Sequence, residues 1–289
     1  MTAVLRIEDL SLGIRTEDGL RPILDGVSLE VQRGQVQGLA GESGSGKTIT
    51  GLTVIGLEPN RSEISGHIWL DGQDLLKLTG SALNAVRGAK VGMVFQDPST
   101  SLHPQLTVGS QLTDHVRYHL KVSKDEARDR AVQALDRVGV QGGRATLARY
   151  PHEFSGGQRQ RIAIAIALAC DPAVLIADEP TTALDVTVQA GVLTLIRSLV
   201  DSLGLAVLFI THDLGVMSAV ADRVAIMRHG QIVENGLREQ VFTAPTHAYT
   251  RELLASLPGA KGGLESRADL ARMFPDGGLE LASPEGLEL

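Results

Sequence analysis

Cysteine, aromatic residues and long apolar runs are all scarce in this chain of 289 residues. Cys170 is the only cysteine, so an internal disulfide and a cysteine-ligated metal cluster are both excluded. The longest uninterrupted apolar run, from Ile162 to Cys170, is too short to cross a bilayer, because a spanning helix needs about 20 residues. The N-terminal segment lacks the basic start and the apolar stretch of a signal peptide. These features favour a protein of the reducing cytoplasm.

The chain also has no excess of positive charge. The formal net charge is −7, from 27 Lys and Arg residues against 34 Asp and Glu residues. A protein that binds nucleic acid usually carries a basic surface, because its cationic side chains displace counterions from the phosphates. We therefore expect no nucleic-acid partner.

Short apolar segments alternate with helical patterns along most of the chain. The predicted strands cover residues 4–10, 27–32, 36–41, 64–70, 91–95, 173–177 and 205–210. Continuous apolar strands are typical of a parallel sheet that is buried on both faces. A helical pattern between Ala190 and Leu203 separates the predicted strands at 173–177 and 205–210. The alternation predicts an α/β fold.

The strand pattern stops between Gln96 and Cys170. Apolar residues recur there at helical spacing, and Ser123 with Glu126 forms a candidate capping box at the start of one helix. We interpret residues 97–168 as an α-helical subdomain inserted into the sheet domain.

A glycine-rich segment follows the predicted strand at 36–41 and has the spacing G-x-x-x-x-G-K-[ST] of a P-loop. Its glycines let backbone N–H groups face phosphate oxygens, Lys47 reaches the β- and γ-phosphates, and the Thr48 hydroxyl holds Mg²⁺. The segment predicts a site for ATP and Mg²⁺. Its candidate nucleotide-binding residues are Gly41, Glu42, Ser43, Gly44, Ser45, Gly46, Lys47, Thr48 and Ile49.

Three other predicted strands end in polar residues, and parallel strands all end at one edge of a sheet. Asp178 and Glu179 follow one strand, His212 follows another, and Gln96 follows a third. Alone, an Asp-Glu pair is often a solvated turn, and a single histidine is often structural. Beside a P-loop we expect Asp178 to bind Mg²⁺ and Glu179 to polarise the attacking water. His212 is expected to contact the γ-phosphate, and Gln96 to hold Mg²⁺ or orient water.

A second candidate anion site begins at Ser155, where Gln158 completes a capping box ahead of an apolar helix. Arg159 and Arg161 fall in the first turns of that helix, where cations oppose the helix dipole. Either Glu153 or a phosphate would balance them. The phosphate alternative places two subunits head to tail, with each P-loop covered by the other subunit's segment.

Five motifs, in this order, resemble the ATPase subunits of ATP-binding-cassette (ABC) transporters: GESGSGKT, VFQDPSTSLHP, FSGGQRQR, VLIADEPTTALD and FITHD. The resemblance covers residues 3–257 and implies a RecA-like P-loop NTPase core with an N-terminal antiparallel β-subdomain. It implies that Glu179 is the catalytic carboxylate, that His212 is the switch histidine and that Asp185 crosses a dimer interface. Signature residues that it places in trans on the partner's ATP are Ser155, Gly156, Gly157 and Gln158.

The segments ADEPTTALDVTVQA and PTHAYTRELLASLP further resemble the dipeptide and oligopeptide importer branch. That branch implies residues 242–289 as a C-terminal extension, with a loosely packed tail after Pro258. It implies a second, paralogous ATPase subunit, two membrane permease subunits, an external substrate-binding protein and a place on the cytoplasmic face of the inner membrane. The alternatives are an exporter ATPase, a soluble cassette ATPase acting on DNA or ribosomes, and a P-loop kinase.

Two residues depart from the family pattern. Phe154 opens the signature where leucine is common, and Ile14 occupies the place of the aromatic residue that often stacks on adenine. An aliphatic contact lacks the stacking contribution, so we expect only a modest preference for ATP over GTP.

Overall fold

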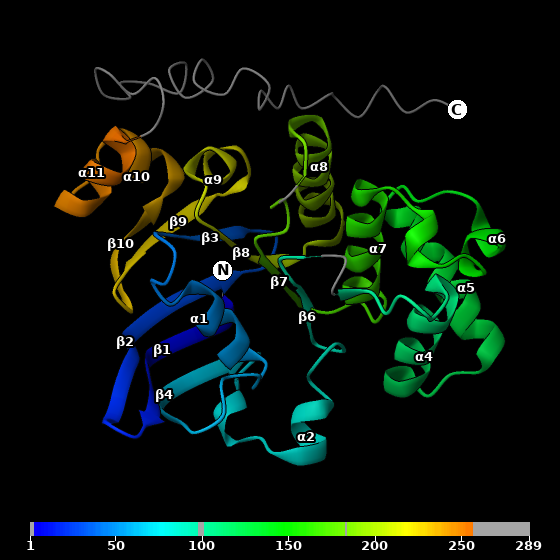
Figure 1. Cartoon of the computed structure of the whole chain (residues 1–289), viewed down its shortest axis with the longest axis horizontal. Helices are drawn as coiled ribbons and strands as arrows, with labels where there is room; N and C mark the ends of the chain where they lie inside the picture. The colour runs from blue at the N-terminus through cyan, green and yellow to red at the C-terminus, as the bar shows by residue number, and fades with distance from the viewer. Residues whose placement is uncertain (1–2, 98–100, 183, 257–289) are drawn as a thin grey trace.

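Two β-sheets form the centre of the molecule (Figure 1). The computed structural model describes residues 3–97, 101–182 and 184–256. The first sheet is antiparallel, in the order β2-β1-β4-β5. Its strands are β1 (Ala3–Thr16), β2 (Gly19–Gln32), β4 (Ser62–Leu70) and β5 (Gln73–Asp74).

The second sheet has the order β10-β9-β3-β8-β7-β6, and only β10 runs antiparallel to its neighbour. Its strands are β3 (Val36–Ala40), β6 (Val91–Val94), β7 (Val174–Asp178), β8 (Ala206–Thr211), β9 (Arg223–Arg228) and β10 (Gln231–Leu237). Every strand predicted from the sequence coincides with one of these ten. The α/β prediction with a parallel sheet is confirmed, whereas β5, β9 and β10 were not predicted.

The second sheet is buried on both faces, as its continuous apolar strands predict. Along β8, Leu208 and Ile210 belong to a core shared with the antiparallel sheet, and Val207 and Phe209 belong to a core on the opposite face. Helix α1 (Lys47–Val54) lies between the two sheets (Figure 1). Helices α8 (Val186–Leu203) and α9 (Leu214–Val220) cover the opposite face.

The described residues between β6 and β7 are helical and lie beside the β6 edge of the sheet (Figure 1). They form α4 (Val108–Leu120), α5 (Lys124–Arg137), α6 (Gly143–Leu147), η2 (Pro151–Glu153) and α7 (Gly156–Leu168). Ser123 caps α5 by accepting a hydrogen bond from the Glu126 N–H at 3.2 Å, which is one half of the predicted capping box.

Helices α10 (Arg238–Thr243) and α11 (Ala248–Ala255) follow β10 and lie at the β10 edge of the second sheet (Figure 1). Short elements η1 (Leu75–Lys77) and α2 (Gly80–Asn84) follow β5. The predicted loose tail after Pro258 lies outside the described residues.

Helix α8 is long and apolar enough, by length and composition, to span a membrane. Its position in the fold gives it another role. Val192, Ile196 and Val200 are buried in the core against the sheet, and Arg197 forms ion pairs with Asp201 and Asp222. We therefore interpret α8 as a core helix.

A substitution at Gly92 of β6 tests how closely the second sheet packs against α7. A Cβ atom there would lie 2.3 Å from the backbone oxygen of Ala167, which cannot move without shifting the helix. We expect Gly92→Ala to lower the free energy of unfolding by about 1–3 kcal/mol, as overpacked cores do. Denaturant unfolding measures this. The control is Gly236→Ala, where the new methyl group meets only side chains, so an equal loss in both variants would contradict the packing argument.

Candidate functional site

The P-loop joins β3 to α1 through glycines in conformations that other residues rarely adopt. The φ angles of Gly41, Gly44 and Gly46 are 152°, 79° and 110°. A Cβ atom on Gly41 would lie 2.1 Å from the backbone oxygen of Met227, so the loop rests directly on β9. No side chain caps the start of α1 in the described chain, which leaves first-turn N–H groups for an anion.

Lys47 crosses beneath this loop. Its Nζ atom donates hydrogen bonds to the carbonyl oxygens of Gly41 and Glu42, both at 2.8 Å. Burial lowers the pKa of Lys47, and the negative charges of Glu179 and Asp178 oppose that shift. The ammonium group is therefore positioned where a phosphate would meet it.

A hydroxyl and a carboxylate meet at the start of α1. The Thr48 hydroxyl donates to Oδ1 of Asp178, the last residue of β7, at 3.1 Å. Burial raises the pKa of Asp178 to about 6, and the charge of Glu179 adds to this rise. Oxygen donors of this kind fit Mg²⁺. The described residues contain no group of three or more His, Cys, Asp or Glu side chains that would hold a metal, so the cation would depend on phosphate oxygens as well.

Glu179 contacts most of the other polar side chains at the carboxyl ends of the parallel strands. Its Oε1 atom lies 2.8 Å from Nδ1 of His212, and its Oε2 atom accepts hydrogen bonds from Gln96 at 3.0 Å and Thr182 at 2.9 Å. Its backbone has φ = 47°, which is uncommon outside glycine, and its N–H donates to the Ile210 oxygen at 2.8 Å. The structure thus brings Gln96, Glu179 and His212 together. Thr182 was not predicted, although it lies inside the motif EPTTALD.

A hollow of about 690 Å³ opens over the P-loop. Its lining includes Lys47, Thr48, Gln96, Glu179 and His212 with most of the glycine-rich segment. The lining also contains two aliphatic residues that the sequence analysis did not select, Ile23 of β2 and Leu253 of α11.

Ile14, the predicted adenine contact, is not part of that lining. It lies in β1, where it pairs with Arg21 and Ser62 and packs against the core between the sheets. The β1–β2 hairpin instead carries Ile23 over the P-loop, with its backbone oxygen 3.3 Å from the position of a Cβ on Gly46. Ile23, and not Ile14, is therefore the β1–β2 hairpin residue that lines the hollow, while the adenine contact at Ile14 stays a prediction.

The second predicted helix start is capped as expected. The Ser155 hydroxyl accepts from the Gln158 N–H at 3.3 Å, and the Gln158 side chain accepts from the Ser155 N–H at 3.0 Å. A Cβ atom on Gly157 would lie 2.5 Å from a methyl carbon of Val188, so this end of α7 packs against the start of α8. Asp185 caps α8 through the Val188 N–H at 2.9 Å.

The arginines of α7 are not balanced by Glu153. That carboxylate accepts from the Tyr150 N–H at 2.6 Å and pairs with Arg149. Arg161 donates instead to the carbonyl oxygens of Val138 at 2.7 Å and Gly191 at 3.3 Å. Val138 ends α5, so the cation lies at a negative helix C-terminus and needs no external anion.

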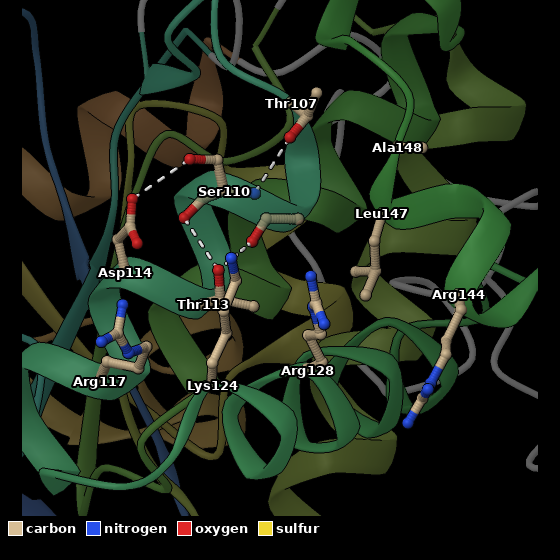
Figure 2. A pocket seen from close by; sticks show the side chains of 11 residues that line it. Thr107, Ser110, Thr113, Asp114, Arg117, Lys124, Arg128, Arg144, Leu147 and Ala148 are labelled. Carbon is tan, nitrogen blue, oxygen red and sulfur yellow. Dashed lines mark hydrogen bonds between the residues drawn. The ribbon is translucent and has the colours of Figure 1, made fainter.

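A second hollow, of about 470 Å³, opens between α4, α5 and α6 (Figure 2). Hydroxyl groups line one side, where Ser110 donates to Asp114 at 3.2 Å and Thr113 donates to the Gly109 oxygen at 2.7 Å. Four cationic side chains also belong to the lining, Arg117 from α4, Lys124 and Arg128 from α5 and Arg144 from α6. The lining is polar and mainly basic.

Comparison with known proteins places these features in one family. The family model described as "ABC transporter" matches residues 24–182. Among curated relatives, the oligopeptide transport ATP-binding proteins OppD and AppD of Bacillus subtilis are each 45% identical to this chain. The OppD alignment covers 89% of this chain and 73% of OppD, and the AppD alignment covers 92% and 81%.

Solved structures agree. The dimeric structure of the ATP-binding cassette MJ0796 bound to ADP and Pi is 26% identical, with a TM-score of 0.70, over 81% of this chain and 98% of that one. The structure of cbiO1 from Clostridium perfringens, part of the ABC transporter complex cbiONQ, is 28% identical, with a TM-score of 0.72, over 89% and 97%. The chain is therefore an ATPase of the ABC transporter family.

Proposed function

We propose that this ATPase binds and hydrolyses ATP to power the import of oligopeptides or related solutes through partner membrane subunits. The observation that carries the proposal is the Glu179 carboxylate, fixed at both oxygens beside a complete P-loop. The relatives support the substrate class, since OppD and AppD are named for oligopeptide transport and a Brucella abortus relative, 43% identical, is named for peptide import.

The residues of the hollow divide into two groups by chemistry. Lys47 and the N–H groups at the start of α1 bind the phosphates, while the Thr48 and Asp178 oxygens hold Mg²⁺. When bound, Mg²⁺ neutralises charge on the phosphate oxygens. Glu179 orients the attacking water and accepts its proton. His212 and Gln96 hold the carboxylate in place, and we propose that His212 also contacts the γ-phosphate and that Gln96 helps to hold Mg²⁺ or to orient the water.

We propose that two ATPase subunits face each other head to tail. The signature residues Ser155 to Gln158 are not in the lining of this chain's own P-loop hollow, and they share a surface with the start of α8 at Asp185. A partner would bring the same surface over this hollow. The MJ0796 cassette, whose structure is dimeric and bound to ADP and Pi, supports the formation of a dimer. The proposed partner is a paralogous ATPase.

The helices between β6 and β7 are the proposed contact with two membrane permease subunits. The hollow between α4, α5 and α6 shares no lining residue with the hollow over the P-loop. Its hydroxyl and cationic groups (Figure 2) would be available to a cytoplasmic loop of a permease subunit. This contact would hold the ATPase at the cytoplasmic face of the inner membrane. An external substrate-binding protein would deliver the solute.

Replacing the catalytic carboxylate tests the proposal. We expect Glu179→Gln to bind ATP normally but to lower ATP turnover in the assembled transporter by at least about 100-fold, the smaller effect expected for loss of a general base. Phosphate release measures turnover, and gel filtration with ATP should show a persistent dimer. The matched control is Glu239→Gln on the exposed surface of α10. Normal hydrolysis by Glu179→Gln would reject the assigned role.

The raised pKa of Asp178 predicts a pH-dependent stability. The Asp178 carboxyl group binds its proton more tightly in the folded protein than in the unfolded chain. Asp178 therefore favours folding fully below about pH 4, and this contribution to stability is lost as the pH rises through about 6. We expect Asp178→Asn, freed of metal and nucleotide with EDTA, to be more stable than the parent at pH 8 by about 2–3 kcal/mol, and equally stable near pH 4.

Thermal unfolding at the two pH values measures this difference. Asp125→Asn on the exposed start of α5 is the control, since its carboxylate is solvated. A stability gain of the same size at both pH values would show that the buried charge is not its cause.

A further inference from the structure

Helix α11 reaches the P-loop, although it follows the ATPase core in the sequence. Tyr249 and Leu253 are four residues apart and therefore lie on one face of the helix. Leu253 lines the hollow over the P-loop. Tyr249 is 3% exposed, and its hydroxyl has no hydrogen-bond partner among the described residues.

The position of α11 is fixed by both strands at the edge of the sheet. Glu234 of β10 accepts from the Thr246 N–H at 2.7 Å and from the His247 N–H at 3.2 Å, just before the helix begins. The Arg228 guanidinium of β9 lies over the Tyr249 ring, 4.4 Å from its centroid. Because β9 also supports Gly41, the helix and the P-loop share one support.

The lining of the hollow contains both polar and aliphatic residues. Lys47, Thr48 and Glu179 are polar groups that suit a triphosphate and its cation. Ile23 and Leu253 are the aliphatic residues of the lining that lie outside the glycine-rich segment, and the described lining contains no Phe, Tyr or Trp. A nucleoside triphosphate has one apolar surface, at its base and ribose, and that surface fits the aliphatic pair.

We propose that α11 is part of the nucleotide site: Leu253 contacts the base and ribose of the bound nucleoside triphosphate, and the packing of Tyr249 against Arg228 of β9 holds the helix there. This inference rests on the proposed function. Leu253 acts on the nucleoside and Lys47 acts on the phosphates, so their effects are separable.

Binding of ATP and of inorganic tripolyphosphate to the full chain, each with Mg²⁺, separates these effects. We expect Leu253→Ala to weaken ATP binding about fivefold, from the loss of part of one buried leucine contact, and to leave tripolyphosphate binding unchanged. Leu253→Gln, similar in length but polar, should weaken ATP binding in the same selective way. Leu254→Ala is the control, since Leu254 is buried in the core and should change the melting temperature but not the ratio of the two affinities.

The contact assigned to Leu253 is overturned if Leu253→Ala keeps the parent's ATP affinity, or if it loses ATP and tripolyphosphate affinity equally. Lys47→Ala separates this outcome from failure of the proposed function. Loss of ATP binding in Lys47→Ala, with normal binding in Leu253→Ala, removes only the role of α11. Normal ATP binding in Lys47→Ala would instead reject the nucleotide site itself.

Discussion

Both oxygens of the Glu179 carboxylate are held by side chains that come from different strand ends. This arrangement requires β6, β7 and β8 to be parallel and in register. Asp178 pairs with Ile210, and the Glu179 N–H continues the ladder to the Ile210 oxygen before the chain turns away at φ = 47°. The turn directs the carboxylate toward His212 on the neighbouring strand. The catalytic geometry therefore depends on sheet register, which the two buried cores stabilise.

One arginine links the signature helix α7 to the helices on both sides of it. Arg161 bridges the end of α5 and the middle of α8, so the helices on either side of α7 are connected through its side chain. Gly157 packs on Val188 in the same region. The capping box satisfies Ser155 and Gln158 within the single chain, so this helix start is already ordered without a partner. In the proposed dimer, a preformed surface of this kind would lose little conformational entropy on closure.

The polar parts of the site were predictable because each follows a pattern. Asp178, Glu179, His212 and Gln96 follow apolar segments, and the parallel sheet brings their side chains to one edge. Ile23 and Leu253 follow no such pattern, since an aliphatic residue in a pocket has the same sequence context as one in a core. The location of Leu253 depends on how α11 packs on β9 and β10, two strands that the sequence analysis did not predict. Ile14 was selected from its position in the family pattern, and in the folded hairpin the residue that lines the hollow is Ile23.

The aliphatic residues of the hollow, Ile23 and Leu253, would distinguish poorly between the bases of bound nucleotides. Leucine and isoleucine side chains offer no hydrogen bonds, so ATP and GTP would differ only in fit and in the cost of leaving polar edges in contact with apolar groups. Apolar pockets discriminate between similar ligands weakly, whereas buried hydrogen-bonding groups reject a mismatched ligand by a factor of about 10⁴ or more. The phosphates are the same in both nucleotides, so Lys47 and Thr48 give no basis for selection. If Ile23 and Leu253 form the proposed base contact, the site would select only weakly between ATP and GTP, and the relative concentrations of the nucleotides would decide which one is hydrolysed.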